Sequence, residues 1–340
     1  GGIAVGSIGF GLGRDFLLPT IALGVVEFTL AMATVLWVRE GRNQWSRYAA
    51  VGDFDADGAM DCVVADNDGA VSALRGRDGS PLWVAEVGFY SGDAPAVGDL
   101  DGDGGQDCVV GSRRKKVLAI RGRDGVVLWG VDLEEEVETS PALGDLDGNG
   151  RLDCVVATDD GSLVALSGED GRRLWTYSAG KKIGAAPALA DLDGDGIVDC
   201  VAGSDDQRFH AVSGRTGKGI WTFESGSYNR STPAFADLDG VPGLECVVAS
   251  WSHRVTALSG VDGRSLWEYE ASDSIDSSPV LADLDGDGTL ECAVGSMDQS
   301  LHVMSGKDGG ALWTFSGMAS FGTPAFGDVD GDRLPECVVT

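Results

Sequence analysis

Carboxylate side chains stand at alternate positions of a short loop that recurs along the chain. The pattern is Asp-x-Asp-x-Asp-Gly-x-x-Asp/Glu, and a clear copy runs from Asp191 to Asp199. Oxygen ligands at alternate positions, on a loop that glycine folds back, can surround a hard cation that takes about six to eight oxygens at about 2.3–2.6 Å. Each such loop is therefore predicted to bind Ca²⁺.

Seven loops carry the pattern in full or in part. Mg²⁺ would require a tighter octahedron, and Zn²⁺ would favour His or Cys, yet none of the three histidines falls in these loops. The predicted metal ligands are Asp53, Asp55, Asp57 and Asp61; Asp99, Asp101, Asp103 and Asp107; Asp145, Asp147, Asn149 and Asp153; Asp191, Asp193, Asp195 and Asp199; Asp237, Asp239 and Glu245; Asp283, Asp285, Asp287 and Glu291; and Asp328, Asp330, Asp332 and Glu336.

Two of the seven loops depart from the pattern. The fifth has Val241 at the third ligand position, so its site is expected to be weak or empty. The seventh has Arg333 where the loops that follow the pattern have glycine, which would strain the loop or place a cation beside the metal. About six Ca²⁺ sites are therefore expected.

The spacing of cysteines and tryptophans indicates the element that must position these loops. Successive cysteines lie 46 residues apart, and 45 for the last pair, while a Leu-Trp or Ile-Trp pair keeps the same phase. Self-similarity at a period of about 20–50 residues indicates a solenoid, a propeller or an array. The cysteines are Cys62, Cys108, Cys154, Cys200, Cys246, Cys292 and Cys337, and the tryptophans are Trp37, Trp83, Trp129, Trp175, Trp221, Trp267 and Trp313.

One repeat, residues 138–177, contains four short apolar runs joined by the carboxylate loop and by two Asp-Gly turns. Asp-Gly between β-type runs favours a tight hairpin, and four strands in a repeat of this length are typical of a propeller blade. The predicted fold is all-β, a seven-bladed β-propeller of four-stranded antiparallel blades over residues 36–340. The strand at Leu36–Val38 would complete the seventh blade, so that the paired ends close the ring. An open β-solenoid is the alternative.

Residues 1–35 allow several interpretations. Phe16–Val38 has a single charge, at Glu27, and by length and hydropathy it qualifies as a membrane-spanning or signal-anchor helix. The repeat register instead predicts strands, since Val5 lies 46 residues before Val51. The segment is thus a degenerate repeat, a clasp, a membrane anchor or an artefact of gene prediction.

Net charge restricts the partners. The chain has 54 acidic and 25 basic residues, a formal charge of −29, which argues against nucleic acid or an anionic membrane surface as partner. The 52 glycines without a collagen-like period indicate a turn-rich protein. Nearly half of the acidic residues belong to the seven loops, so the charge excess is mostly a set of local cation sites.

Two segments carry a family resemblance. Residues 187–199, PALADLDGDGIVD, resemble the FG-GAP (VCBS-type) repeat of the integrin α-subunit propeller and its relatives, which implies a calcium-binding loop. Residues 165–175, ALSGEDGRRLW, resemble the tryptophan-docking repeat of PQQ-type propellers. The resemblance covers residues 36–340 and implies the fold more specifically than the function, because propellers host enzymes, adhesins and scaffolds alike.

Enzyme functions fit the repeats poorly. A quinoprotein would resemble its family further in a vicinal Cys-Cys pair, which does not occur here, and a polysaccharide lyase would need an irregular blade. The atypical inserts are only Arg113–Lys116 and Trp251–Arg254. We therefore expect a non-enzymatic, calcium-stabilised structural or recognition propeller, extracellular or at the cell surface, such as an adhesin or a subunit of a fibrous assembly. The ectodomain of a single-pass membrane protein that binds a protein or glycan is an alternative.

Other residues carry further expectations. The sequon at Asn229 is compatible with N-glycosylation of an exported protein. The cysteines are interpreted as small buried apolar residues rather than inter-blade disulfides, and the tryptophans as core between blades. The basic cluster Arg113–Lys116 forms either a solvated turn or a contact with an acidic face of another copy, which would allow a head-to-tail fibre.

Overall fold

Every regular element that the structure describes is a β-strand. The structure, a computed structural model, describes residues 3–6, 22–29, 32–40, 45–66, 69–88, 93–241, 243–317, 322–328 and 334–338. The chain divides into two compact units: residues 1–143, 151–156 and 166–174 form the first, and residues 144–150, 157–165 and 175–340 form the second.

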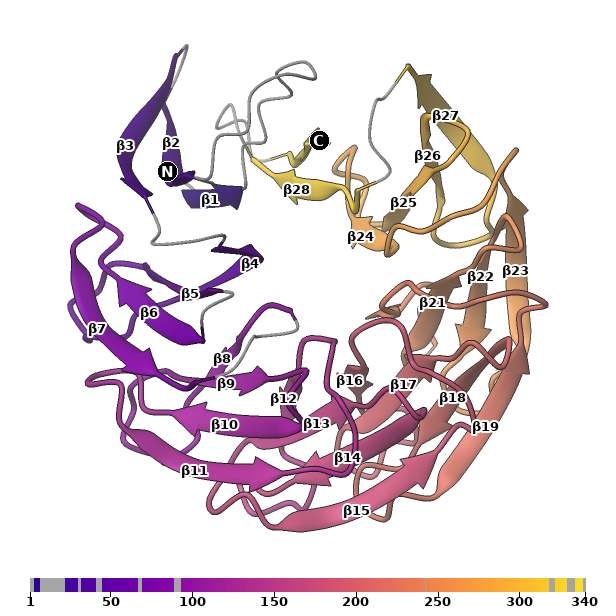
Figure 1. Cartoon of the computed structure of the whole chain (residues 1–340). Helices are drawn as coiled ribbons and strands as arrows, with labels where there is room; N and C mark the ends of the chain where they lie inside the picture. The colour runs from indigo at the N-terminus through magenta and orange to yellow at the C-terminus, as the bar shows by residue number, and fades with distance from the viewer. Residues whose placement is uncertain are drawn as a thin grey trace, which may run out of the picture. The chain divides into compact units, whose positions relative to one another are not determined.

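Six four-stranded antiparallel sheets follow one another along the chain, and each pairs its strands in sequence order (Figure 1). We call them blades 1 to 6. Blade 1 is β4 (Trp45–Gly52), β5 (Asp61–Asp66), β6 (Ala70–Leu74) and β7 (Pro81–Glu86); blade 2 is β8 (Ala96–Gly98), β9 (Asp107–Gly111), β10 (Lys116–Ile120) and β11 (Val127–Asp132); blade 3 is β12 (Ala142–Gly144), β13 (Asp153–Ala157), β14 (Ser162–Leu166) and β15 (Arg173–Ser178). Blade 4 is β16 (Ala188–Ala190), β17 (Asp199–Gly203), β18 (Arg208–Val212) and β19 (Gly219–Glu224); blade 5 is β20 (Ala234–Ala236), β21 (Glu245–Ala249), β22 (Arg254–Ser259) and β23 (Ser265–Glu270); blade 6 is β24 (Val280–Ala282), β25 (Glu291–Ser296), β26 (Ser300–Ser305) and β27 (Ala311–Ser316).

The ends of the chain form two smaller sheets. A two-stranded sheet contains β28 (Ala325–Gly327) and β29 (Glu336–Val338), and a three-stranded sheet contains β1 (Ile3–Gly6), β2 (Ala22–Thr29) and β3 (Met32–Glu40). The predicted all-β fold of four-stranded antiparallel sheets is confirmed, and the number of sheets agrees with seven blades. The pairing of the two chain ends to close the ring stays a prediction. The described part of Phe16–Val38 consists of strands, and no helix within the described residues is long and apolar enough to cross a membrane.

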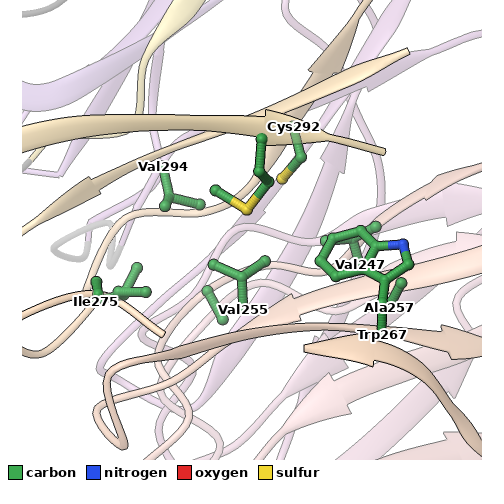
Figure 2. Packing of buried hydrophobic residues seen from close by; sticks show 10 residues of the cluster. Val247, Val255, Ala257, Trp267, Ile275, Cys292 and Val294 are labelled. Atoms are coloured by element: carbon green, nitrogen blue, oxygen red, sulfur yellow. The ribbon is translucent and has the colours of Figure 1, made fainter. Parts of the chain in front are cut away.

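The second strand of each blade is an apolar run buried on both faces. All five residues of β9 and of β17 are buried, as expected for a strand covered on both sides. Six of the seven cysteines lie in these strands as buried free thiols, and the half-buried Cys337 lies in β29. Desolvation raises the pKa of Cys292 to about 12. Figure 2 shows Cys292 among apolar neighbours of the cluster that also contains Trp267. The interpretation as core residues is confirmed for the cysteines of blades 1 to 6 and for the tryptophans of blades 1 to 5, whereas Trp313 is 46% exposed.

The fourth strand of each blade carries the repeated tryptophan, which lies at a β-bulge in blades 1, 2, 4, 5 and 6. Ala211 pairs with Trp221, but the next residue, Val212, pairs with Gly219, so one residue is skipped. The same shift occurs in blades 1, 2, 5 and 6. Because a bulge locally changes the direction of side chains, it sets the orientation of the indole ring toward the following blade.

The tryptophans of blades 1 to 5 each bind a glycine 39 residues further along the chain, whereas Trp313 of blade 6 is 46% exposed. The Nε1 of Trp175 donates a hydrogen bond to the carbonyl of Gly214 (2.5 Å). Its ring lies against Gly217, whose φ is +68° and where an added Cβ would come within 2.7 Å of Trp175. Only glycine fits there, which explains the Asp-Gly or Thr-Gly turn in each repeat. The equivalent donor and acceptor pairs are Trp83 and Gly122, Trp129 and Gly168, Trp221 and Gly260, and Trp267 and Gly306.

The antiparallel strands give each blade two different ends. The loop between the first and second strands lies at the same end as the turn between the third and fourth strands, and we call this the acidic end. The turn between the second and third strands lies at the opposite end, together with the segment that leads to the next blade. We call this the turn end.

Candidate metal centres

The first carboxylate of each loop folds the loop backbone. The Asp191 carboxylate accepts hydrogen bonds from the N–H groups of Gly194 (2.8 Å) and Gly196 (3.0 Å). Both glycines have positive φ, a conformation that other residues adopt at a cost. The loops at Asp99, Asp145 and Asp283 repeat both hydrogen bonds, and Asp53 binds the N–H groups of Asp57 and Gly58.

The second and third carboxylates make short turns of the same kind. Asp193 accepts from the N–H of Asp195 (3.1 Å), and Asp195 accepts from the N–H of Ile197 (2.8 Å). The hydrogen bond from Ile197, together with Arg215, lowers the pKa of Asp195. Each N–H occupies one lone pair of a carboxylate that has about four acceptor sites, so oxygen capacity remains for a cation.

The last carboxylate is buried and joins the loop to the tryptophan of the preceding blade. Asp107 is 1% exposed, and its oxygens accept from the N–H groups of Leu100 and Gly122, both at 3.0 Å. Trp83 donates to the carbonyl of the same Gly122. Desolvation raises the pKa of Asp107, although these hydrogen bonds oppose the shift. Asp199, Gly214 and Trp175 repeat the arrangement, which the sequence analysis did not foresee.

The loops bring carboxylate oxygens close enough to share one ion. Ligand oxygens of Asp99, Asp101 and Asp107 lie within 4.8 Å of one another, and so do those of Asp191, Asp193 and Asp199 and of Asp53, Asp55 and Asp57. Two oxygens bound to one Ca²⁺ at about 2.3–2.6 Å can lie no more than about 5 Å apart, so the spacing fits calcium. In the first loop, Asp55 Oδ1 is buried and has no hydrogen-bond partner. A buried oxygen without a partner is costly unless a cation occupies its lone pairs.

Arginines of the same blade lie beside several of these loops. Arg123 pairs with Asp103 (2.8 Å) and Arg215 with Asp195 (3.1 Å), each from the turn between the third and fourth strands. Arg75 pairs with Asp55 through the other oxygen of that carboxylate, Oδ2 (3.2 Å). Such exposed pairs contribute little to stability, but they hold the carboxylates in place.

The loops whose sequences depart from the pattern keep part of its hydrogen bonding. In the fifth loop, Asp237 accepts from Gly240 (2.7 Å) and Val241 is 58% exposed, so it points no ligand into the loop; weak or absent binding there stays a prediction. The final Glu245 accepts from Leu238 (2.7 Å), as Glu291 accepts from Leu284 in the sixth loop. In the third loop, Asp147 accepts from the N–H of Asn149 (3.1 Å), and Asp153 accepts from the N–H of Gly168 (3.1 Å). In the seventh loop, Asp328 and Glu336 are described, whereas Asp330, Asp332 and Arg333 lie outside the described residues.

The turn end holds pairs that change from blade to blade. Arg113 pairs with Glu138 (3.0 Å), Asp205 with Arg230 (3.6 Å), and the indole N–H of Trp251 donates to Asp276 (2.7 Å). In every case the partners are 25 residues apart, and they join the turn of one blade to the segment leading to the next. The basic cluster Arg113–Lys116 is thus a turn with ion pairs inside the chain. A comparison of residues 25 apart could have revealed these pairs.

The predicted glycosylation site does not fit its surroundings. Asn229 is fully buried, and its side-chain amide donates to the carbonyl of Ser204 (3.3 Å). The hydroxyl of Ser231 donates to the carbonyl of Ala249 (2.6 Å). Glycan attachment requires an accessible amide, so the sequon is instead a buried part of the segment between blades 4 and 5.

The chain is similar to a known family of repeat proteins. The family model described as outer membrane protein assembly factor BamB matches residues 67–244 and 205–329. The chain belongs to this PQQ-like repeat family. Comparison with curated proteins gives no significant match. The predicted resemblance to PQQ-type repeats is confirmed, and the resemblance to FG-GAP repeats stays a prediction.

Solved structures support the fold. The crystal structure of BamB from Moraxella catarrhalis is similar with a TM-score of 0.60 and 21% sequence identity, over 80% of this chain and 78% of that chain. The computationally designed Ika8 protein is similar with a TM-score of 0.67 and 16% identity, over 92% of this chain and 89% of that chain. Identities this low carry the β-propeller fold alone.

Proposed function

We propose that this chain is a non-enzymatic propeller of the cell envelope or cell surface that Ca²⁺ stabilises and that presents its turn end to a protein partner. Membership of a family described as an assembly factor of the outer membrane supports a scaffolding role. The observation that carries the calcium proposal is the converging carboxylates of the loops together with the unpartnered Asp55 Oδ1.

Calcium would stabilise the fold by linkage. Desolvation raises the pKa values of Asp107 and Asp199, so the folded chain holds these anions at a cost. A cation that binds the folded loop and not the unfolded chain offsets this cost by RT ln(1 + [Ca²⁺]/Kd). At ten times the dissociation constant this amounts to about 1.4 kcal/mol for each site.

The regularity of the loops supports a structural role over catalysis. In blades 2, 4 and 6 the same carboxylates accept the same backbone N–H groups. A catalytic centre is expected to break such local rules at one place, and to leave a titratable group directed at a substrate. Here the carboxylates of the loops whose pKa is raised are equivalent members of a repeat, and their hydrogen bonds hold the loops that contain them.

Thermal unfolding of the full chain in Ca²⁺, in Mg²⁺ and in a chelator tests the proposal, with calorimetric titration giving the stoichiometry. We expect about six sites and a melting temperature that rises with Ca²⁺ well beyond the effect of Mg²⁺. The double variant Asp191→Asn, Asp193→Asn should lose one site. Asp170→Asn, in an exposed turn outside the loops, removes a carboxylate as a control and should retain all sites. Equal melting temperatures in Ca²⁺ and chelator would contradict the proposal.

A further inference from the structure

Two blade junctions are joined by a tyrosine, a histidine and an aspartate. Between blades 3 and 4, the hydroxyl of Tyr177 lies 3.0 Å from Nδ1 of His210, and Nε2 of the same ring lies 3.2 Å from the Asp206 carboxylate. His210 is 5% exposed, so the imidazole ring fills the junction. The tyrosine comes from the fourth strand of one blade and the histidine from the third strand of the next.

The junction between blades 5 and 6 repeats this arrangement. Tyr269 lies 2.8 Å from Nδ1 of His302, whose Nε2 lies 2.9 Å from Asp298. His302 is also 5% exposed. Two junctions separated by two repeats therefore have the same ring in the same place, held by a hydroxyl on one nitrogen and a carboxylate on the other.

The junction between blades 4 and 5 lacks all three groups. Counting 46 residues on from the first set places Phe223, Thr256 and Ser252 at these positions, so a hydroxyl, an imidazole ring and a carboxylate are missing. All three residues line a cavity of about 100 Å³. The cavity thus lies in the register position that an imidazole ring fills in the junctions on either side.

The lining of the cavity combines flat apolar walls with hydroxyl groups. Phe209 and Phe223 contribute aromatic walls. Ser250, Ser252 and Thr256 also line it, and the hydroxyls of Ser250 and Ser252 contact each other at 2.6 Å. Hydroxyls both donate and accept, so they can bind either kind of ring nitrogen. A planar ring with polar edges is complementary to such a lining.

Charged groups at the cavity select against anions. Glu224 and Glu268 both line it, and Arg254 pairs with Glu268 at 3.6 Å. One carboxylate remains in excess, which disfavours a negatively charged ligand and permits a neutral or cationic one. This matches the two filled junctions, where a carboxylate faces each imidazole ring.

We propose that this cavity is a binding site for a small planar nitrogen heterocycle of the imidazole type, which occupies the place that His210 and His302 fill in the neighbouring junctions. The inference is independent of calcium binding and of the partner, because it rests on the register of three junctions and on the lining of one cavity. A cavity of this size matches a single five-membered ring, since dry cavities near 150 Å³ accept benzene.

Imidazole itself is the probe, with binding to the full chain followed by amide chemical shifts and by calorimetry. We expect one saturable site. Thr256→His should weaken imidazole binding at least tenfold and raise the melting temperature. The triple variant Phe223→Tyr, Ser252→Asp, Thr256→His should have the same two effects. The matched variant Tyr269→Phe, Asp298→Ser, His302→Thr should open a second site and double the stoichiometry. Acetate and benzene should bind at least tenfold more weakly than imidazole.

Several results would overturn the proposal. These are the absence of saturable imidazole binding, equal affinity for benzene or acetate, and binding that Thr256→His leaves unchanged. The single variant keeps the test valid if the triple variant fails to fold. A cavity that holds water alone would give no saturable shifts and counts against the proposal in the same way.

Discussion

The two ends of each blade follow different rules. At the acidic end, the hydrogen bonds of the loop are the same in blades 2, 4 and 6, and their side chains are nearly identical. At the turn end the backbone is equally regular but the side chains change. The last residue of the turn between the second and third strands has positive φ in all six blades; it is glycine in blades 1 and 3, and the others have Lys115, Gln207, His253 and Gln299.

This difference distinguishes a surface that repeats for structural reasons, at the acidic end, from a surface that varies between blades, at the turn end. A left-handed conformation costs a residue with a Cβ roughly 1–2 kcal/mol, and Gly161 shows that glycine serves the same turn. The turn end therefore retains side chains where backbone energetics favour glycine. We take the acidic end as the part that stabilises each blade, and the turn end as the part that distinguishes one blade from another.

The largest difference in stability between the two ends is expected when a tryptophan is replaced by alanine at each end. Trp175→Ala removes a buried ring and its hydrogen bond to Gly214, which should lower the free energy of unfolding by about 3–5 kcal/mol. Trp251→Ala removes a partly exposed ring and its bond to Asp276, with an expected loss of about 1 kcal/mol. Urea denaturation measures both. Equal losses would remove the distinction between the ends.

Replacing a carboxylate at each end should give a smaller difference in stability between the two ends. Asp107→Asn leaves a buried backbone N–H without an acceptor and should cost about 1–3 kcal/mol, even in a chelator. Asp159→Asn at the turn end breaks only a half-exposed pair with Lys182 (2.8 Å) and should cost less than about 1 kcal/mol. Urea denaturation of both variants in chelator measures the two losses of unfolding free energy. A larger loss for Asp159→Asn than for Asp107→Asn would contradict the prediction.

Glycine is expected to be the more stable residue at left-handed positions of both ends, so gaining it at the turn end and losing it at the acidic end should change stability in opposite directions. Gln207→Gly relieves a φ of +74° and is expected to raise the free energy of unfolding by up to about 1 kcal/mol. Gly194→Ala at the acidic end imposes the same strain on a φ of +76° and should lower it by about 1–2 kcal/mol. Thermal melts of the two variants suffice. A stabilising Gly194→Ala would show that the loop does not hold this conformation in solution.

The smallest expected effect is on the pH dependence of stability, which should have opposite signs for an aspartate at each end. Burial raises the pKa of Asp107, so in chelator its contribution is present below the unfolded value of about 3.8 and is lost as pH rises through the folded pKa. For Asp298, burial raises the pKa but the bond to His302 and other interactions outweigh it, so the pKa is lowered. Its contribution is present above about 3.8 and is lost as pH falls through the folded pKa.

The two aspartates can be separated by denaturation between about pH 2.5 and 6 in chelator. Asp298→Asn should flatten the loss of stability on acidification, whereas Asp107→Asn should flatten the loss on raising the pH. Ca²⁺ should suppress the Asp107 effect and leave the Asp298 effect in place. Identical pH profiles for the two variants would contradict the assignment of opposite pKa shifts.

The sequence predicted the features that recur within one repeat. The phase of Cys200 and Trp221 indicated the strands and their number, and the alternating carboxylates indicated the loops. It did not predict that Asp107 would bind Gly122, because that hydrogen bond depends on how the loop and the turn at the acidic end of one blade pack together. Junctions such as that of Tyr177 and His210 were missed for a similar reason: their residues are 33 apart and belong to different blades, and only two of the junctions contain them.

The hydrogen bonds from the tryptophans of blades 1 to 5 to a glycine 39 residues later also bear on how the chain folds. Every such contact is between consecutive blades, so closing it requires only a short stretch of chain, and the entropy cost does not grow with the number of blades. Stability then accumulates by nearest-neighbour coupling, as in repeat proteins. A nascent chain can dock each new blade on the one before it while the remainder is still being synthesised.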